Sequence, residues 1–324
     1  LLVQIDGKLP NIALMRISAH LKSTGTSVSL VRSVHGDLSG YDDVLASMIF
    51  TRSLPLAQSL LESCPHATIG GTGWDLATTI ESIGVATTKQ DYSIYPDYRY
   101  SIGFSQRGCR LKCPFCIVPA KEGKVRTEST IDEIWRGEPW PKNIVLLDND
   151  FFGQLNWRDR IDEMIGGQFK VSFNQGINAR MLTDETAAAI ASVQYYDDDF
   201  KTKRIYTAWD NLKDEQRLFT GLNVLVKHGV KPDQIMVYML CGYWPGETQT
   251  DREYMRKRLR EFGCRPYPMP YVRTKELIGF QRWVVRRGDL ICSWEDFEKA
   301  GYRPEKVTGV QLRRGFENEI IDEV

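Results

Sequence analysis

Residues 101–126, SIGFSQRGCRLKCPFCIVPAKEGKVR, contain three of the seven cysteines of this 324-residue chain. Cys109, Cys113 and Cys116 follow the spacing C-x3-C-x2-C. No fourth cysteine or histidine lies nearby in the sequence to complete the four ligands of a structural zinc site. Three thiolates can instead hold three irons of a [4Fe–4S] cube and leave the fourth iron open to another ligand. The spacing therefore predicts such a cluster, with zinc completed by a distant ligand as the alternative.

The residues around these cysteines resemble the cluster loop of the radical S-adenosylmethionine (radical SAM) superfamily. Phe115 directly precedes Cys116, and residues 107–126 are especially similar to the corresponding segment of tRNA methylthiotransferases. The resemblance implies that Cys109, Cys113 and Cys116 ligate the cube. It also implies that the open iron chelates S-adenosylmethionine (SAM), with Phe115 as an aromatic contact for the cofactor.

The same resemblance implies the reaction. An external one-electron reductant of the flavodoxin or ferredoxin type reduces the cluster, and SAM splits into methionine and a 5′-deoxyadenosyl radical. That radical abstracts a hydrogen atom from the substrate, while the protein positions the reactants and excludes water. We therefore expect an enzyme of the transferase or the isomerase and lyase type.

The composition is that of an ordinary globular protein, with 42% hydrophobic and 26% charged residues. The formal net charge is zero, so the overall charge favours neither nucleic acid nor a membrane surface as a partner. No apolar run reaches the roughly 18 residues of a membrane span, and no signal-peptide pattern opens the sequence. Seven cysteines without framework spacings favour a reducing, cytoplasmic location.

The first 96 residues predict a short, doubly wound, Rossmann-like α/β domain, because strand and helix patterns alternate. The expected strands are residues 1–5, 27–31, 41–51 and 67–71, and the expected helices are residues 11–22, 56–61 and 74–83.

This order of elements resembles the cobalamin-binding domain that precedes many radical SAM barrels. The likeness rests on a Pro-Asn loop at residues 10–11 and on a strand that ends in Gly70 and Gly71. The domain is short by at least one βα unit, and it lacks a D-x-H-x-x-G motif. Bound cobalamin, a substrate-docking role and a reduced relic of such a domain stay open as alternatives.

Six further strand patterns follow a Tyr-, Asp- and Pro-containing linker at residues 90–98. With helical segments between them, they match the partial (β/α)6 TIM-like barrel that the resemblance implies for residues 97–270. Residues 271–324 are expected to form a C-terminal helical extension. The six strands are residues 101–104, 143–148, 170–174, 204–208, 235–240 and 265–269.

Polar residues follow these strands, where barrel enzymes carry their chemistry. The resemblance implies that Asp148 and Asn149 contact the amino group of SAM, and that the turn from Gly242 to Glu247 lies beside its adenine. Amide side chains suit ribose hydroxyls, and an arginine suits a carboxylate. The remaining candidates for contact with SAM are therefore Asn174, Gln175, Asn178 and Arg180.

Three residues are candidates for catalysis itself: Asp148, Asp210 and Cys241, the last as a hydrogen-atom donor. Trp209 is expected to reach the rim beside Asp210, and Met269 and Tyr271 are expected to line the open end. The structural alternatives are a helix cap or turn for the aspartates and a small buried side chain for Cys241.

The region from residue 251 to residue 314 is basic, with sixteen Lys and Arg against nine Asp and Glu. Predicted helices at 256–262 and 280–290 carry much of this charge, with Trp283 and Trp294 interleaved. Such a surface can grip phosphates and stack bases, which makes a nucleobase or nucleic acid a candidate substrate. A solvated helix face with tryptophans that cap the barrel is the alternative.

The outcome of the reaction stays open at this stage. Methylthio transfer follows from the loop's resemblance, although only Cys64 precedes the motif. Methyl transfer follows from the cobalamin-like domain, and isomerisation or carbon-skeleton chemistry needs no second cofactor. The alternative of another class is a non-catalytic iron–sulfur protein that binds or transfers electrons.

Overall fold

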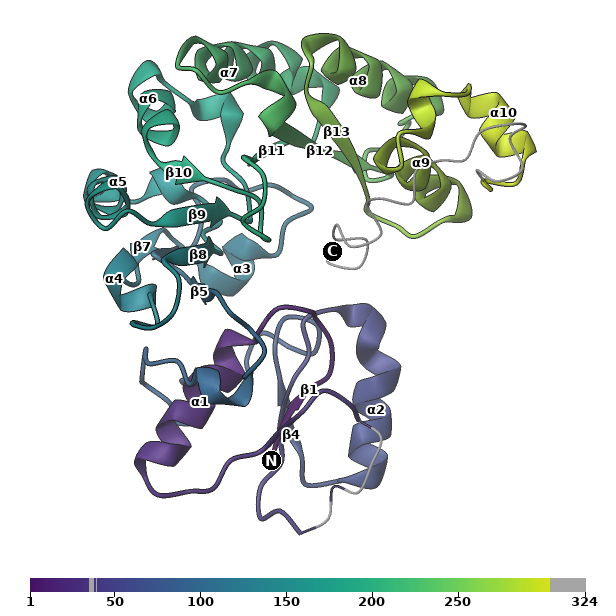
Figure 1. The fold of residues 1–324 in the computed structure, drawn as a ribbon. Coiled ribbons are helices and arrows are strands. Elements are labelled where there is room, and N and C mark those ends of the chain that lie inside the picture. The colour runs from purple at the N-terminus through teal and green to yellow at the C-terminus, as the bar shows by residue number, and fades with distance from the viewer. Residues whose placement is uncertain (35–37, 39, 304–324) are drawn as a thin grey trace. The chain divides into compact units, whose positions relative to one another are not determined.

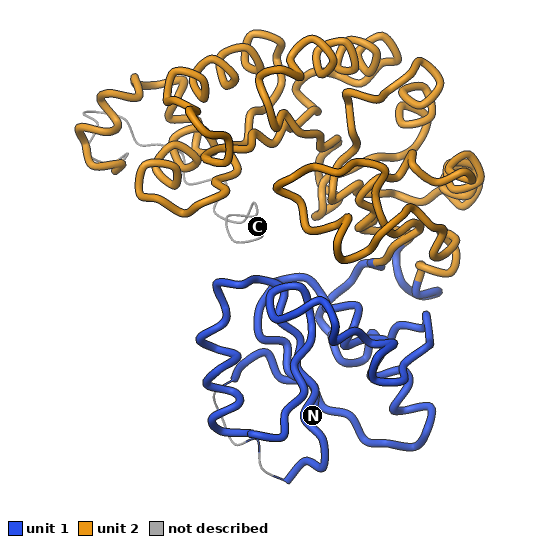
Figure 2. The backbone as a smooth tube through the Cα atoms, turned by 180° about the vertical axis from the view of Figure 1, so that it is seen from behind, with its two compact units in different colours: residues 1–102, 136–141, 320–324 blue, residues 103–135, 142–319 orange. Residues whose placement is uncertain are grey.

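The computed structural model describes residues 1–34, 38 and 40–303. This part of the chain is an α/β protein with parallel sheets, and it divides into two compact units (Figure 2). Among the described residues, unit 1 comprises 1–102 and 136–141, and unit 2 comprises 103–135 and 142–303. None of the helices in these ranges has the length and apolarity needed to cross a lipid bilayer.

Unit 1 is built on a four-stranded parallel sheet in the order β2-β1-β3-β4. The strands are β1 (Leu2–Gln4), β2 (Leu30–Val31), β3 (Leu45–Ser47) and β4 (Thr68–Gly70). Helix α1 (Ile12–Ser23) follows β1, and α2 (Leu54–Ser63) follows β3 (Figure 1).

The side chains of β1 alternate between the two faces of this sheet, as strand geometry requires. Leu2 packs in a cluster with Leu14 of α1, whereas Val3 packs in a cluster with Ala57 and Leu60 of α2. One helix therefore covers each face. All four strands and the first two helices expected from the sequence are present.

The helix expected at residues 74–83 is wrong, because this segment forms turns. The carboxylate of Asp75 accepts hydrogen bonds from the backbone N–H groups of Ala77 and Thr78 at 2.7 and 2.6 Å. Thr79 and Ser82 bind each other's backbone in the same way. Short polar side chains that bond to the local backbone compete with a helix, and here they prevail.

The Tyr-containing segment after residue 90 is ordered and belongs to unit 1. Asp91 accepts hydrogen bonds from Ser18 at 2.6 Å and from Lys22 at 2.7 Å, both on α1. The hydroxyl of Tyr95 is buried; it accepts from the N–H of Asn11 and donates to Gln4. This segment is therefore part of the packed unit.

The six strands predicted for the barrel region are present, with β5 (Ser101–Gly103) at the boundary of the two units, and unit 2 adds three short strands, β6 (Gln106–Arg107), β7 (Arg126–Thr127) and β10 (Gln194–Tyr195). Two parallel sheets have the orders β10-β9-β8-β5 and β11-β12-β13. The predicted strands are β5 (Ser101–Gly103), β8 (Asn143–Leu146), β9 (Lys170–Phe173), β11 (Ile205–Trp209), β12 (Ile235–Cys241) and β13 (Arg265–Pro270).

From β8 onward a helix connects each predicted strand to the next predicted strand, which allows these strands to run parallel. The gap between the two sheets is bridged where the N–H of Ile177 donates to the carbonyl of Tyr206 at 2.8 Å. The helices of unit 2 are α3 (Val118–Glu122), α4 (Ile131–Ile134), α5 (Trp157–Gly166), α6 (Asp184–Ser192), α7 (Glu215–Lys227), α8 (Gln249–Phe262), α9 (Lys275–Val285) and α10 (Trp294–Lys299).

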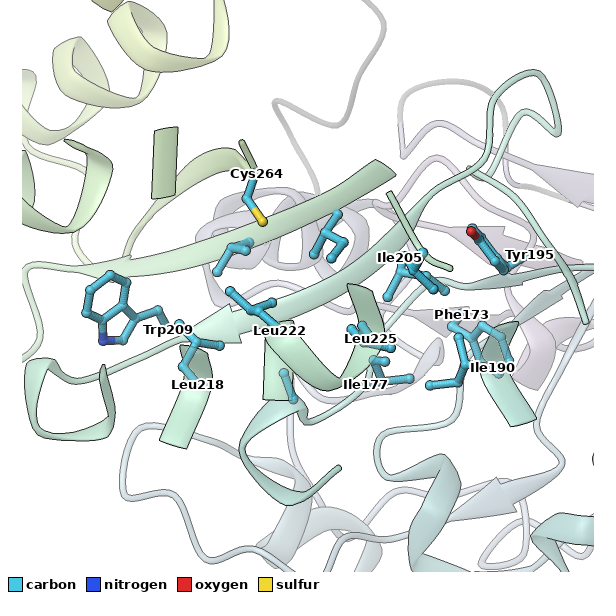
Figure 3. Packing of buried hydrophobic residues seen from close by; sticks show 14 of the residues in the cluster. Phe173, Ile177, Ile190, Tyr195, Ile205, Trp209, Leu218, Leu222, Leu225 and Cys264 are labelled. Atoms are coloured by element: carbon cyan, nitrogen blue, oxygen red, sulfur yellow. The ribbon is translucent and has the colours of Figure 1, made fainter. Parts of the chain in front are cut away.

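The main hydrophobic core lies between these helices and one face of the strands (Figure 3). Leu218, Leu222 and Leu225 of α7 pack there against Ile205 of β11. The opposite face of β11–β13 carries a separate aromatic and methionine cluster, which contains Tyr206, Met236 and Tyr267. Both faces of these strands are therefore apolar, as expected for strands buried on both sides.

Candidate functional site

The three cysteines of the motif lie in a hairpin that follows β5. Strands β6 (Gln106–Arg107) and β7 (Arg126–Thr127) pair antiparallel, with Arg107 opposite Arg126. We call residues 106–127 the cysteine hairpin. Cys109 and Cys113 are half-buried and Cys116 is exposed, and all three are free thiols.

Gly108, directly before the first cysteine, closes the hairpin through its backbone. Its φ is +81°, and a Cβ atom at this position would lie 2.3 Å from the carbonyl oxygen of Lys124. The N–H of Gly108 donates to the buried carboxylate of Glu122 at 2.9 Å, and Arg107 pairs with the same carboxylate at 2.9 Å. Only glycine fits this approach of the two arms.

A two-fold ion pair connects the cysteine hairpin to the segment after β8. The guanidinium of Arg110 donates to both carboxylate oxygens of Asp150, at 2.8 and 2.9 Å, and the N–H of Arg110 adds a third bond at 3.0 Å. Asp150 is buried. Two-point Arg–carboxylate pairs fix orientation as well as position, so this contact holds the loop between Cys109 and Cys113.

Removing this pair is expected to weaken unit 2 measurably. In a double-mutant cycle of Arg110→Gln and Asp150→Asn in urea denaturation, each variant should lower the free energy of unfolding by about 1–3 kcal/mol. Because both variants remove the same contact, the double variant should lose clearly less than the sum. The exposed pair of Arg158 and Glu185 is the control, with a coupling expected below about 1 kcal/mol. Additive losses at Arg110 and Asp150 would contradict the assignment.

Cys113 lies beside charged groups from the ends of two other strands. Burial raises the pKa of its thiol, and the charge of Asp210 raises it further, whereas the side chain of Arg180 opposes this by favouring the thiolate. Burial also raises the pKa of Cys109, where Asp150, Cys113 and Cys116 add to the effect. The thiols of the motif thus contribute to one another's pKa.

Arg180 is held in a network of its own. It lies in the short 3-10 turn Ala179–Met181, and it donates to Asn178 at 3.1 Å and to Asp214 at 2.6 Å. A carboxylate oxygen of Asp210 lies 3.6 Å from its guanidinium. Burial lowers the pKa of Arg180, but these carboxylates outweigh that effect and the net shift is upward. The structure therefore brings Asn178, Arg180 and Asp210 together beside Cys113.

Phe115 reaches the loop after β12. Its ring meets that of Tyr243 edge-on, with centroids 5.4 Å apart, and Tyr243 in turn contacts Tyr271 at 4.8 Å. Trp244 donates its indole N–H to the carbonyl of Asp210 at 2.6 Å. Aromatic contacts thus link the cysteine hairpin to the ends of β11, β12 and β13.

The amide candidates after β9 bind a neighbouring acidic loop. The amide of Asn174 donates to Asp198 at 2.8 Å, and Gln175 donates to Asn174 at 2.6 Å. Asn149, after β8, donates to Glu122 of the cysteine hairpin at 3.1 Å. The side chain of Asn149 thus binds the hairpin, whereas those of Asn174 and Gln175 bind each other and Asp198.

Asp148 is a buried carboxyl that ties β8 to the residues after β5. It accepts hydrogen bonds from the N–H groups of Ser105 at 2.8 Å and Gln106 at 3.2 Å, and from the hydroxyl of Ser105. Burial raises its pKa to about 7, although these donors oppose the shift. Its carboxyl is enclosed by the protein, so its observed contacts are structural.

The raised pKa of Asp148 predicts a pH dependence of stability. Because the folded pKa lies above the usual value, the folded chain binds more protons than the unfolded chain between about pH 4 and pH 7. This carboxyl therefore lowers stability as the pH rises through that range. Asp148→Asn should remove the loss, so its stability relative to wild type should increase from pH 5 to pH 8 in denaturant titrations. A difference that is constant with pH would contradict the prediction.

The remaining candidates divide between the loop after β12 and the core. Both carboxylate oxygens of Glu247 accept from the N–H of Gly242, at 2.9 and 3.0 Å, which closes the predicted turn. Cys241 is fully buried, donates to the carbonyl of Met239 and has a pKa raised to about 12 by burial. Trp209 was expected at the rim, which is wrong, because its ring lies in the core.

The basic side chains of α8 are neutralised within unit 2. Arg256 and Arg260 of α8 both bind the buried carboxylate of Asp289, at 3.1 and 2.9 Å. Trp283 and Trp294 lie in the hydrophobic core, which favours the alternative of a solvated helix face with packed tryptophans over a base-stacking surface. Neither ring is free to stack on a base. Residues 304–324 lie outside the described part of the chain.

The loops that follow the strands of unit 1 bind one another closely. The carboxylate of Asp6 accepts from the N–H groups of Ile49 and Phe50 at 2.8 and 2.9 Å. Gly71 has a φ of +106°, and a Cβ there would lie 2.4 Å from the carbonyl oxygen of Met48. This glycine therefore serves the close approach of two loops.

The cysteine hairpin carries the type of donor that an iron–sulfur cube takes. It supplies three soft donors, free of disulfides, whose thiols contribute to one another's pKa. Within residues 1–34, 38 and 40–303, no group of three His, Cys, Asp or Glu side chains is arranged to hold a metal ion. The thiolates that hold a cube do not converge on a single metal ion, because each binds a different iron. The donor chemistry therefore matches a cluster with one open iron.

Arg110, Glu122, Asp150 and Tyr243 were missed as site residues by the sequence reasoning. Arg110 lies inside the motif and Asp150 follows a predicted strand, so both positions were visible, but their pairing was not. In comparisons with known proteins, no family model, no curated protein and no solved structure matches this chain.

Proposed function

We propose that this chain is a radical SAM enzyme, with unit 2 as a partial (β/α)6 barrel and unit 1 as a short Rossmann-like domain. The observation that carries the proposal is the cysteine hairpin, a C-x3-C-x2-C loop after the first strand of the barrel. Contacts to the ends of later strands support it, through Asp150 after β8, Arg180 after β9 and Tyr243 after β12.

Cys109, Cys113 and Cys116 would hold a [4Fe–4S] cluster. When bound, the cluster would supply the single electron that splits SAM into methionine and a 5′-deoxyadenosyl radical. The fit of the donors to this group is chemical, because three thiolates leave one iron for the cofactor. The raised pKa values of Cys109 and Cys113 imply that cluster loading displaces protons, because a bound metal favours the thiolate.

The surrounding side chains would bind and orient SAM. Arg180 is held rigidly by Asn178 and Asp214, and its guanidinium offers further N–H donors to a carboxylate. The paired rings of Phe115 and Tyr243 offer an apolar wall that excludes water from one side of the loop. Glu247 keeps the Gly242 turn rigid, which suits recognition of adenine through backbone groups.

The test is anaerobic reconstitution with iron and sulfide, followed by dithionite and SAM. We expect methionine and 5′-deoxyadenosine in equal amounts, at a rate that depends on the cluster. A reconstituted protein that titrates reversibly but forms no 5′-deoxyadenosine would be the non-catalytic electron-transfer protein, and the enzyme proposal would be wrong.

A further inference from the structure

We infer that unit 1 carries a docking groove for a proline-rich segment of a partner protein. The groove is open and has a volume of about 760 Å³. It lies outside the cysteine hairpin, and both stretches of chain that line it belong to unit 1. The lining residues are Pro96, Asp97, Arg99 and Tyr100 from the first stretch, with Trp140 and Pro141 from the second.

The ring of Trp140 is fixed in place by a stacked cation. The guanidinium of Arg136 lies 3.5 Å from the centre of the Trp140 ring and 4.2 Å from that of Tyr92. The side chain of Arg136 also donates to the carbonyl of Tyr98 at 2.7 Å, and its backbone N–H donates to the hydroxyl of Ser101 at 3.1 Å. Arg136 therefore ties the two stretches together. A wall that is ordered before binding lowers the entropy cost of docking a ligand.

The surface of the groove is aromatic and contains one unused hydrogen-bond donor. The ring of Tyr100 contacts that of Tyr98 edge-on, with centroids 5.9 Å apart, and Pro96 and Pro141 are exposed beside it. The indole N–H of Trp140 has no acceptor among the residues that the structure describes, so it can donate to a carbonyl of a bound chain. A polyproline II helix makes no internal hydrogen bonds and leaves its carbonyls available to such a donor. Aromatic-lined grooves are the sites that dock segments of this kind.

The charges around the groove favour a peptide over a nucleic acid. The two positive residues of the two stretches, Arg99 and Arg136, are balanced by two negative ones, Asp97 and Glu138. A phosphate backbone requires an excess of positive charge, and Arg99 would repel a methylated ammonium ion held in an aromatic cage. Asp97 and Arg99 are exposed, and neither forms an ion pair within the described residues. Both charges can therefore pair with residues that flank the prolines, and their opposite signs would set the direction of the bound peptide.

The experiment measures peptide binding to the whole chain by fluorescence anisotropy. The probe is a labelled oligoproline of about eight residues that ends in lysine, and its control has glycine and serine in place of proline. Trp140→Leu removes the flat ring and the indole N–H, and Asp97→Lys reverses one exposed charge. Glu62→Lys is the matched control variant, because Glu62 is an exposed carboxylate of α2 that does not line the groove. Circular dichroism reports whether each variant is folded.

We expect the oligoproline to bind at least about tenfold more tightly than the glycine and serine peptide, because its extended helix is already formed. Trp140→Leu should weaken oligoproline binding by at least about tenfold. Asp97→Lys should weaken it about threefold at low salt, and this difference should shrink at high salt because the charges are screened. Glu62→Lys should bind both peptides as the wild type does.

Equal binding of the two peptides by the wild type would overturn the inference, and so would a folded Trp140→Leu variant that binds oligoproline normally. If Trp140→Leu does not fold, Asp97→Lys decides, since wild-type affinity at low salt in that variant would overturn the groove. Binding of single-stranded oligothymidine in place of oligoproline would overturn it in favour of a nucleic acid. The titration needs neither cluster nor SAM, so its result is independent of the proposed function.

Discussion

Cys113→Ala is expected to abolish both the visible absorbance of the reconstituted protein and its cleavage of SAM. Two thiolates cannot hold three irons of a cube, so the loss should be complete. Iron and sulfide analysis together with 5′-deoxyadenosine assay measures both quantities. We choose Cys113 because Arg180 and the charge of Asp210 also act on its thiol.

Cys292→Ala is the matched control, because Cys292 is a half-buried free cysteine outside the hairpin. Its thiol donates only to the carbonyl of Gly288, so cluster content and turnover should equal those of the wild type. Retention of a full cluster by Cys113→Ala would disprove the ligand assignment. Loss of the cluster in both variants would point to a general defect in folding.

Gly108→Ala is expected to prevent cluster loading while leaving the rest of unit 2 folded. An added Cβ would collide with the carbonyl of Lys124, and a φ of +81° already disfavours any other residue. The arms of the cysteine hairpin would have to separate, which would break the bond from Gly108 to Glu122. We expect iron to bind at least tenfold more weakly, a loss of binding free energy on the order of 1.4 kcal/mol. The far-ultraviolet circular dichroism should change little.

Gly123→Ala separates backbone strain from collision. Gly123 lies in the same hairpin with a φ of +71°, but an added Cβ there meets no atom within 4 Å. Its ψ of −142° lies outside the left-handed helical region, so an alanine there should carry a strain of about 1–3 kcal/mol, but without a collision the hairpin should keep most of the iron. Equal loss of iron in both variants would show that backbone strain, and not collision with the carbonyl of Lys124, causes the loss.

The strands of this chain were predictable because their patterns are local. Runs such as residues 143–148 and 235–240 are long, apolar and bounded by polar loops, and β8 and β12 form there. The helix at 74–83 failed for a local reason too, because Asp75 bonds to the backbone two and three residues ahead. Apolar residues at helical spacing do not produce a helix where polar side chains stabilise turns in this way.

The contacts of the candidate site could not be predicted from the sequence. The pair of Arg110 and Asp150 joins residues 40 positions apart, and the contact of Phe115 with Tyr243 spans two sheets. The sequence pattern places Trp209 at the rim and leaves Trp283 and Trp294 between a base-stacking surface and a packed position. All three rings lie in the core, where burial of large rings is favourable. Sequence spacing identified the three thiols, whereas tertiary packing determines what surrounds them.

Electron paramagnetic resonance of the reduced, reconstituted protein with and without SAM tests the open iron most directly. The account predicts a [4Fe–4S] signal that changes shape when SAM is added, because SAM binds the iron that lacks a cysteine. The same change should occur before any substrate is present. A cluster signal that SAM leaves unaltered, or a protein that takes up zinc and no iron, would contradict it.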